Sequence, residues 1–157
     1  MQKNLFVRSL LVGAATLAVG TAAFAGENWV GTWKLNPAKS KLGTNAVRAQ
    51  TLTFEATPAG IKLTSDGTDA QGKPMHGGYT SKFDGKDVPW AGNPMADTAC
   101  ANRVDDNAYE NVGKKGGKAV VTAKVAFSKD GKTLTITQTG TDAQGVAINA
   151  VQVYDRQ

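Results

Sequence analysis

Short runs in which apolar and polar residues alternate make up most of the chain. In residues 48–56 (RAQTLTFEA), Gln50, Leu52 and Phe54 fall on one face of an extended strand, and the residues between them fall on the other. Residues 119–128 alternate most clearly, with Val, Ala, Val and Phe on one face and Thr, Lys and Ala on the other. A period of two residues predicts β-strands that bury one face.

Turn-forming residues separate these runs at intervals of about 8 to 12 residues, a spacing typical of an antiparallel meander. Pro89 interrupts a short run at residues 88–90 and predicts a strand edge, bulge or end there. Together with an opening strand near residues 29–36, the pattern predicts about nine or ten strands. The predicted turns lie at residues 57–60, 66–72, 84–87, 105–107, 115–117, 129–132 and 140–145.

A sheet of this kind has two exposed edges unless its first and last strands meet. Exposed edges promote pairing between chains, and closure into a barrel removes them. We therefore predict an all-β fold, an antiparallel up-and-down β-barrel of about 8–10 strands, in which the two ends of the domain lie side by side.

One hexapeptide occurs twice. The sequence GTDAQG stands at residues 67–72 and again at residues 140–145. Each copy holds one carboxylate, whereas calcium takes several oxygen ligands, so a calcium site is disfavoured. We predict that both copies are hairpin turns in which Gly supplies a positive φ and Asp bonds to the local backbone.

The first 25 residues have the features of a cleavable signal peptide. Lys3 and Arg8 supply positive charge, residues 9–24 are apolar and uncharged, and the residues Ala-Phe-Ala at 23–25 suit signal peptidase. The apolar run is shorter than the ~20 residues that cross a bilayer. We expect residues 1–25 to be removed, which leaves one domain at residues 26–157 with no membrane span, in the periplasm or secreted. A retained N-terminal anchor is the alternative.

Charge and cysteine content narrow the function classes. The chain carries a formal net charge of +5, which falls to +3 when Lys3 and Arg8 are removed. The densest basic stretch, KKGGK at residues 114–118, has the composition of a hairpin tip, so we expect no nucleic-acid binding. Cys100 is the one cysteine, so no internal disulfide can form. We interpret it as a buried small apolar residue; a reactive thiol and a disulfide between chains are the alternatives.

Both ends of the predicted domain resemble known barrels. The stretch WVGTWKLN at residues 29–36 contains Gly31-Thr32-Trp33, which resembles the first strand of the calycin group of lipocalins, fatty-acid-binding proteins and avidin-type proteins. Residues 153–156 (VYDR) are similar to the last strand of fatty-acid-binding proteins. The resemblance implies an exported, lipocalin-like bacterial protein in which Arg156 packs over Trp33 and closes one end of the barrel. Gly31 would let another backbone come close.

The chain departs from fatty-acid-binding proteins in two places. Only residues 37–46 separate the first two predicted strands, which is too short for that family's helical lid. Gln152 stands where that family has an arginine that grips the fatty-acid carboxylate, although the family's tyrosine is matched by Tyr154. The resemblance therefore implies a barrel without a helical lid and does not imply a fatty acid bound in the family's usual way.

The residues offer little for catalysis. His76 is the one histidine, and no cysteine or carboxylate stands at a spacing typical of zinc ligands. No nucleophile-elbow pattern occurs either. We therefore expect neither an enzyme nor a metal or cofactor site.

A barrel of about eight strands is either filled by side chains or able to hold one small ligand. We predict an exported binding protein for a small apolar molecule. The alternatives are a protein-interaction module, such as an inhibitor of an envelope or secreted hydrolase, and an envelope protein with a scaffolding role. A cavity of ~300 Å³ or more would favour a small ligand. The predicted ligand-binding residues, which could instead pack the core or a barrel end, are Tyr79, Trp90, Tyr109, Gln152 and Tyr154.

Overall fold

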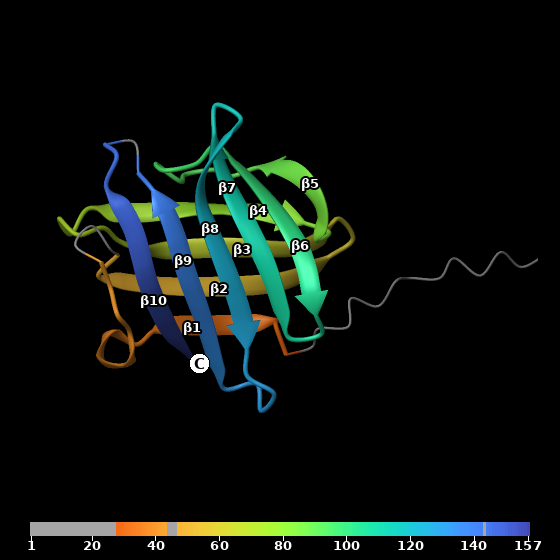
Figure 1. Cartoon of the computed structure of the whole chain (residues 1–157). Helices are drawn as coiled ribbons and strands as arrows, with labels where there is room; N and C mark the ends of the chain where they lie inside the picture. The colour runs from red at the N-terminus through yellow and green to blue at the C-terminus, as the bar shows by residue number, and fades with distance from the viewer. Residues whose placement is uncertain (1–27, 44–46, 143) are drawn as a thin grey trace, which may run out of the picture.

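The computed structural model describes residues 28–43, 47–142 and 144–157, and these residues form one antiparallel barrel (Figure 1). The predicted signal peptide lies outside the described residues. The one helical element in the described part is a short 3₁₀ helix, η1 (Pro37–Lys39), between the first two strands. The strands are β1 (Gly31–Leu35), β2 (Ala49–Thr57), β3 (Gly60–Thr68), β4 (Pro74–Ser81), β5 (Asp84–Pro89), β6 (Thr98–Asp105), β7 (Ala108–Lys115), β8 (Lys118–Phe127), β9 (Thr133–Thr141) and β10 (Ala147–Arg156).

The strands follow an up-and-down order. Consecutive strands pair with each other except β4 and β5, and β1 also pairs with β10, so the sheet runs β4-β3-β2-β1-β10-β9-β8-β7-β6-β5. The two remaining edges, β4 and β5, approach each other where Gly78 and Ala91 exchange two backbone hydrogen bonds of 2.9 and 3.0 Å. The predicted antiparallel up-and-down barrel is therefore confirmed, with ten strands in the described residues and nearly complete closure.

Three predicted turns differ in extent from the observed ones. Residues 84–87 belong to β5 and contain a register shift, and the chain turns just before them at Phe83, whose φ is 57°. The turn is held by the Phe83 N–H, which donates to Ser81 Oγ at 2.9 Å. Residues 66–68 and 140–141 are strand rather than loop. Glycine suits these two strand positions because a Cβ on Gly67 or Gly140 would lie 2.1 or 2.2 Å from a backbone oxygen of the preceding, paired strand.

One end of the barrel is filled by aromatic side chains. The Trp29 ring stacks on Phe127 at a centroid distance of 5.1 Å and meets the edge of Phe83 at 5.1 Å. Trp33 and Phe54 each meet Phe127 edge-on, at 5.3 and 5.4 Å. We call these five residues the aromatic plug. Such aromatic pairs stabilise a core beyond the effect of their buried area.

The two ends of the chain meet beside this plug. Trp33 on β1 is the register partner of Arg156 on β10, and the Arg156 Cζ lies 5.1 Å from the centroid of the Trp33 ring. The guanidinium also donates to the backbone oxygens of Val30 at 2.5 Å and Asn28 at 3.2 Å. A Cβ on Gly31 would lie 3.0 Å from Arg156 Nη2, so glycine leaves room for the guanidinium. Residues 29–33 (WVGTW) thus supply two plug residues, Trp29 and Trp33, and Gly31 between them leaves space for the guanidinium.

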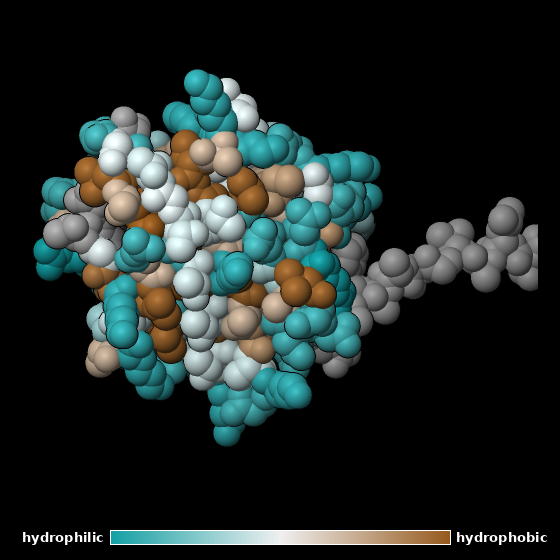
Figure 2. All heavy atoms as spheres, in the orientation of Figure 1, coloured by the Kyte–Doolittle hydropathy of each residue, from teal (hydrophilic) through white to brown (hydrophobic). Residues whose placement is uncertain are grey.

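The outer face of β6–β10 is mostly polar, with outward-facing valines such as Val112, Val151 and Val153 among the polar residues. Figure 2 shows it as hydrophilic and near-neutral surface with separate apolar areas. The residues that alternate with the buried Val121, Val125 and Phe127 of β8 are threonine, lysine or alanine, and none of them is fully buried. This alternation places one face of each strand toward the barrel interior.

Candidate ligand-binding cavity

The barrel is hollow at the end opposite the aromatic plug. A cavity of about 540 Å³ lies there, and none of the five plug residues lines it. Loop residues at its mouth come from the β3–β4, β5–β6 and β9–β10 connections, as Asp69, Met95 and Val146 show. The cavity is therefore open at one end and closed by the plug at the other.

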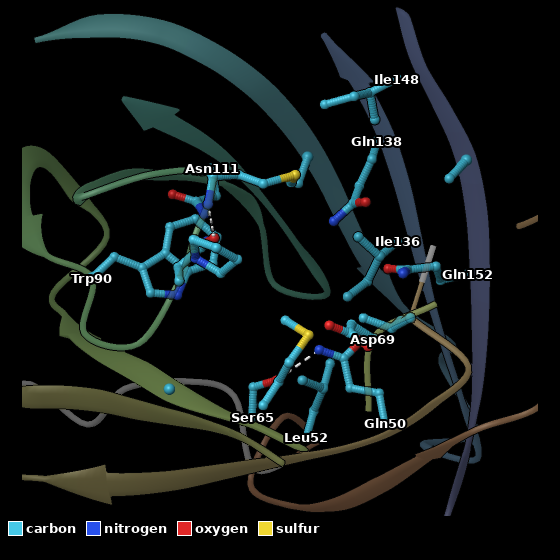
Figure 3. Close-up of a pocket in the computed structure, with 18 of the residues that line it drawn as sticks. Gln50, Leu52, Ser65, Asp69, Trp90, Asn111, Ile136, Gln138, Ile148 and Gln152 are labelled. Atoms are coloured by element: carbon cyan, nitrogen blue, oxygen red, sulfur yellow. Dashed lines mark hydrogen bonds between the residues drawn. The ribbon is translucent and has the colours of Figure 1, made fainter. Parts of the chain in front are cut away.

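The register of β7 to β10 places carboxamides and small residues at one level of the wall. Asn111 is paired with Ala123, Ala123 with Gln138, and Gln138 with Ala150. All four residues line the cavity. The two alanines leave the space into which the amides of Asn111 and Gln138 project. Figure 3 shows these two side chains on different sides of the cavity, with Trp90 close to Asn111.

The next level toward the plug is more apolar. There Tyr109 is paired with Val125, Val125 with Ile136, and Ile136 with Gln152. Val125 and Ile136 are buried and line the cavity. Leu52 on β2 and Leu63 on β3 add further apolar surface, and Ile148 on β10 adds more nearer the mouth. The wall therefore combines an apolar body with a small number of polar groups, as small-molecule sites commonly do.

A chain of hydrogen bonds crosses the floor of the cavity. The Tyr154 hydroxyl donates to Gln50 Oε1 at 2.6 Å, and Gln50 Nε2 donates to Ser65 Oγ at 2.6 Å (Figure 3). Tyr154 also lies 3.3 Å from Gln152 Oε1. Because a phenol has one proton, the shorter bond to Gln50 takes it, and the contact with Gln152 is the weaker one.

Burial keeps the cavity phenols protonated. The hydroxyls of Tyr79 and Tyr109 lie 3.3 Å apart. Desolvation raises the pKa of Tyr79 to about 12, although its hydrogen bond with Tyr109 lowers the value in part. Desolvation also raises the pKa of Tyr109, with Tyr79 adding to the effect, and desolvation raises the pKa of Tyr154. These three groups therefore stay neutral at physiological pH.

The histidine and the carboxylates of the cavity lie at its mouth. His76 Nδ1 lies 2.5 Å from Asp66 Oδ1, and both side chains are more than half exposed. Asp69 Oδ1 accepts the backbone N–H of Gln71 and Lys73, and Asp142 Oδ1 accepts those of two residues in its own loop. The prediction that both GTDAQG copies form Asp-bonded hairpin turns is confirmed. No Lys or Arg of the described chain lines the cavity.

The five residues predicted to bind a ligand all line this one cavity. Trp90 meets Tyr79 edge-on at 5.2 Å near the mouth. Tyr109 also lies 4.7 Å from Phe83, so it joins the cavity to the aromatic plug. Part of the Tyr109 ring therefore packs in the core, which is the alternative to ligand binding given for this residue. Ligand contact by Tyr79, Trp90, Tyr109, Gln152 and Tyr154 stays a prediction.

Sequence reasoning did not single out four polar lining residues, Gln50, Ser65, Asn111 and Gln138. The sequence feature that could identify them is a polar residue on the same strand face as buried apolar residues. Gln138, for example, follows Leu134 and Ile136 on the inner face of β9. Gly77 lines the cavity and Gly78 does not, because neighbouring residues of a strand face opposite ways.

Cys100 lies outside the core. Its side chain is half-buried rather than buried, so the prediction of a buried residue is wrong. It donates to the Gly85 oxygen at 3.2 Å. Desolvation and the neighbouring Asp87 raise the pKa of the thiol, which lowers the thiolate fraction that reacts.

Metal-ligand clusters and membrane-spanning helices are both absent from the described residues. No cluster of three or more His, Cys, Asp or Glu side chains that could hold a metal is found there. No helix in those residues is long and apolar enough to cross a bilayer.

No family model and no curated protein matches the sequence. Among solved structures, a redesigned β-barrel, mFAP1, bound to DFHBI, matches this chain with 13% sequence identity and a TM-score of 0.44. The match covers 85% of this chain and 100% of that chain. A likeness at this level carries no information on what this chain binds.

Proposed function

We propose that this chain is an exported protein that binds one small, uncharged, mainly apolar molecule inside its barrel. The observation that carries the proposal is the cavity of about 540 Å³. That volume lies within the range of about 300–1,000 Å³ found for small-molecule pockets. The mechanism is sequestration, in which buried apolar ligand surface contributes roughly 25 cal/mol per Å².

The charge of the lining supports an uncharged ligand. No Lys or Arg among the described residues reaches the cavity, and Asp69 and Asp142 stand at its mouth. A carboxylate moved into this interior would lose its hydration without gaining a cation, which is costly. Gln152, in place of the arginine of fatty-acid-binding proteins, is consistent with this choice.

The distribution of exposed apolar side chains supports a small ligand over a protein partner. Among the described residues, the exposed large apolar side chains are Met95, Val104 and Val146. Met95 and Val146 also line the cavity. Two of these three exposed apolar side chains therefore lie where a ligand would enter. An interaction module, for instance an inhibitor of an envelope hydrolase, would instead need a broad exposed apolar patch.

Native mass spectrometry of the protein purified from its own envelope tests the proposal. We expect a polypeptide that begins at Gly26, because the sequence of residues 1–25 favours cleavage, and a co-purifying small molecule of neutral mass. Retention of residues 1–25 would contradict export by cleavage. A co-purifying polypeptide in place of a small molecule would support the protein-interaction alternative.

Replacing each of two alanines on β8 by phenylalanine tests where the ligand binds. Ala123 is buried and lines the cavity, whereas Ala126, three residues later, is exposed on the outer face. We expect Ala123→Phe to fill the cavity and abolish the co-purifying mass. Ala126→Phe makes the same chemical change outside and should leave that mass in place. Equal retention by both variants, measured by native mass spectrometry, would show that the ligand binds elsewhere.

A further inference from the structure

One buried polar atom in the cavity wall, Asn111 Oδ1, lacks a hydrogen-bond partner in the described residues. Asn111 on β7 is only 3% exposed, and its Oδ1 accepts no hydrogen bond from the described residues. The other buried polar side chains of the described chain both have a polar partner: Ser81 Oγ accepts the Phe83 N–H, and Gln152 lies 3.3 Å from the Tyr154 hydroxyl. A buried acceptor without a donor is rare in proteins and needs an explanation. The contents of the cavity are the available source of a donor.

Water can supply that donor while the barrel holds no ligand, but a ligand that fills the cavity displaces it. Displacing such a water with an apolar group leaves Asn111 Oδ1 bare, and a buried polar group without a partner costs about 1–3 kcal/mol. Displacing it with an O–H or N–H group removes that cost. The wall therefore discriminates between ligands that can donate to Asn111 and ligands that cannot.

We propose, on the basis of the function proposed above, that the ligand is a neutral molecule that donates a hydrogen bond from a hydroxyl or N–H group to Asn111 Oδ1. Its apolar body lies along Val125 and Ile136, one level nearer the plug, and beside the Trp90 ring. Hydroxylated aromatic compounds, alcohols and lactams have this chemistry. Hydrocarbons and ionised fatty acids do not.

Gln138 gives the ligand a second polar contact. It stands at the same level as Asn111, with Ala123 between them on β8. Two strand spacings separate Asn111 from Gln138, which is about 10 Å. The Gln138 amide makes no hydrogen bond with the described residues and is half-buried. A ligand with a second polar group about that far from its donor would satisfy both amides.

Three biphenyl probes test the donor requirement with one scaffold. 4-Phenylphenol carries a donor, 4-methylbiphenyl replaces its hydroxyl by a methyl group, and 4-methoxybiphenyl carries an acceptor alone. Equilibrium dialysis against the mature chain measures each dissociation constant. We expect 4-phenylphenol to bind at least tenfold more tightly than the other two. A cavity that recognised only apolar surface would instead prefer the methyl compound.

Asn111→Leu isolates the residue responsible. Leucine has the same branched arrangement of four heavy atoms as asparagine, its larger methyl groups face a hollow interior, and it buries no unpaired oxygen, so we expect the variant to fold. It should bind 4-methylbiphenyl at least as tightly as 4-phenylphenol. Asn102→Leu makes the same change at an exposed position of β6 that does not line the cavity, and it should keep the tenfold preference.

Each outcome decides one claim. Equal binding of 4-phenylphenol and 4-methylbiphenyl to the native chain would overturn the donor requirement and leave the proposed function standing. Tight binding of 4-methoxybiphenyl would show that the wall donates rather than accepts, which also overturns it. A preference that survives Asn111→Leu would assign the contact to another residue. Failure of all three probes to bind would contradict the proposed function itself.

Discussion

Replacing Trp33 by alanine is expected to lower the free energy of unfolding by about 3 to 5 kcal/mol. The side chain is fully buried, packs edge-on against Phe127 at 5.3 Å and lies beneath the Arg156 guanidinium. Its Nε1 donates to the Trp29 oxygen at 3.2 Å. Alanine would leave a hole in the aromatic plug that its neighbours cannot fill. Urea denaturation of the mature chain measures the loss, a large share of the 5–15 kcal/mol typical of domains.

Trp90→Ala is the matched control, because Trp90 is half-buried and lines a cavity that is already hollow. We expect a smaller loss there, with ligand binding affected more than folding. Equal destabilisation by the two variants would argue against a special role for the plug. A double-mutant cycle with Arg156→Met separates the guanidinium contact, which should couple to Trp33 by about 0.5–2 kcal/mol. A coupling near zero would leave Arg156 as a backbone partner only.

The fold could be predicted because short stretches of sequence specify its strands and hairpins. Alternation in stretches such as residues 119–128 indicates strands, and Gly and Asp between them indicate hairpins, so an antiparallel order follows. Local signals failed where a tertiary contact decides the backbone. Gly67 and Gly140 resemble turn residues, yet they lie in strands because another backbone approaches them closely. The turn at Phe83 has a positive φ that few non-glycine residues adopt, and the sequence around it favoured the Asp-Gly pair that follows.

The candidate site could be predicted only in part. Tyr79, Trp90, Tyr109 and Tyr154 were found by residue type, since aromatic side chains are common in pockets. Asn111 was not found, because the sequence of β7 does not show which of its faces is buried. Tyr109, Asn111 and Gly113 lie on one face, and the other face contains Val112. Asn111, Ala123 and Gln138 lie side by side because of the register between β7, β8 and β9. The sequence of a single strand does not specify that register.

Alkaline unfolding is the second large expected effect. All three tyrosines of the chain, Tyr79, Tyr109 and Tyr154, are buried in the barrel. Burial raises the pKa of each above its ordinary value of 10.0, to about 12 for Tyr79. Above pH 10 the folded chain therefore binds more protons than the unfolded chain, and stability falls as pH rises. Each phenol contributes a slope of up to about 1.4 kcal/mol per pH unit, so three contribute up to about 4.

We expect these phenols to leave the stability of the mature chain unchanged below pH 10. Between about pH 10 and 12 we expect the chain to unfold cooperatively. Tyrosinate absorbance in the near-ultraviolet and circular dichroism in the far-ultraviolet should change together, because the phenols ionise when the barrel opens. Tyrosinate absorbance that appears near pH 10 while the strands remain folded would contradict the burial of these hydroxyls. Tyr79→Phe is the control: it removes one ionisable phenol and should reduce the pH slope by about a third. The lysines also titrate in this range, but Tyr79→Phe leaves them unchanged, so the difference between the two chains isolates the contribution of the cavity phenol.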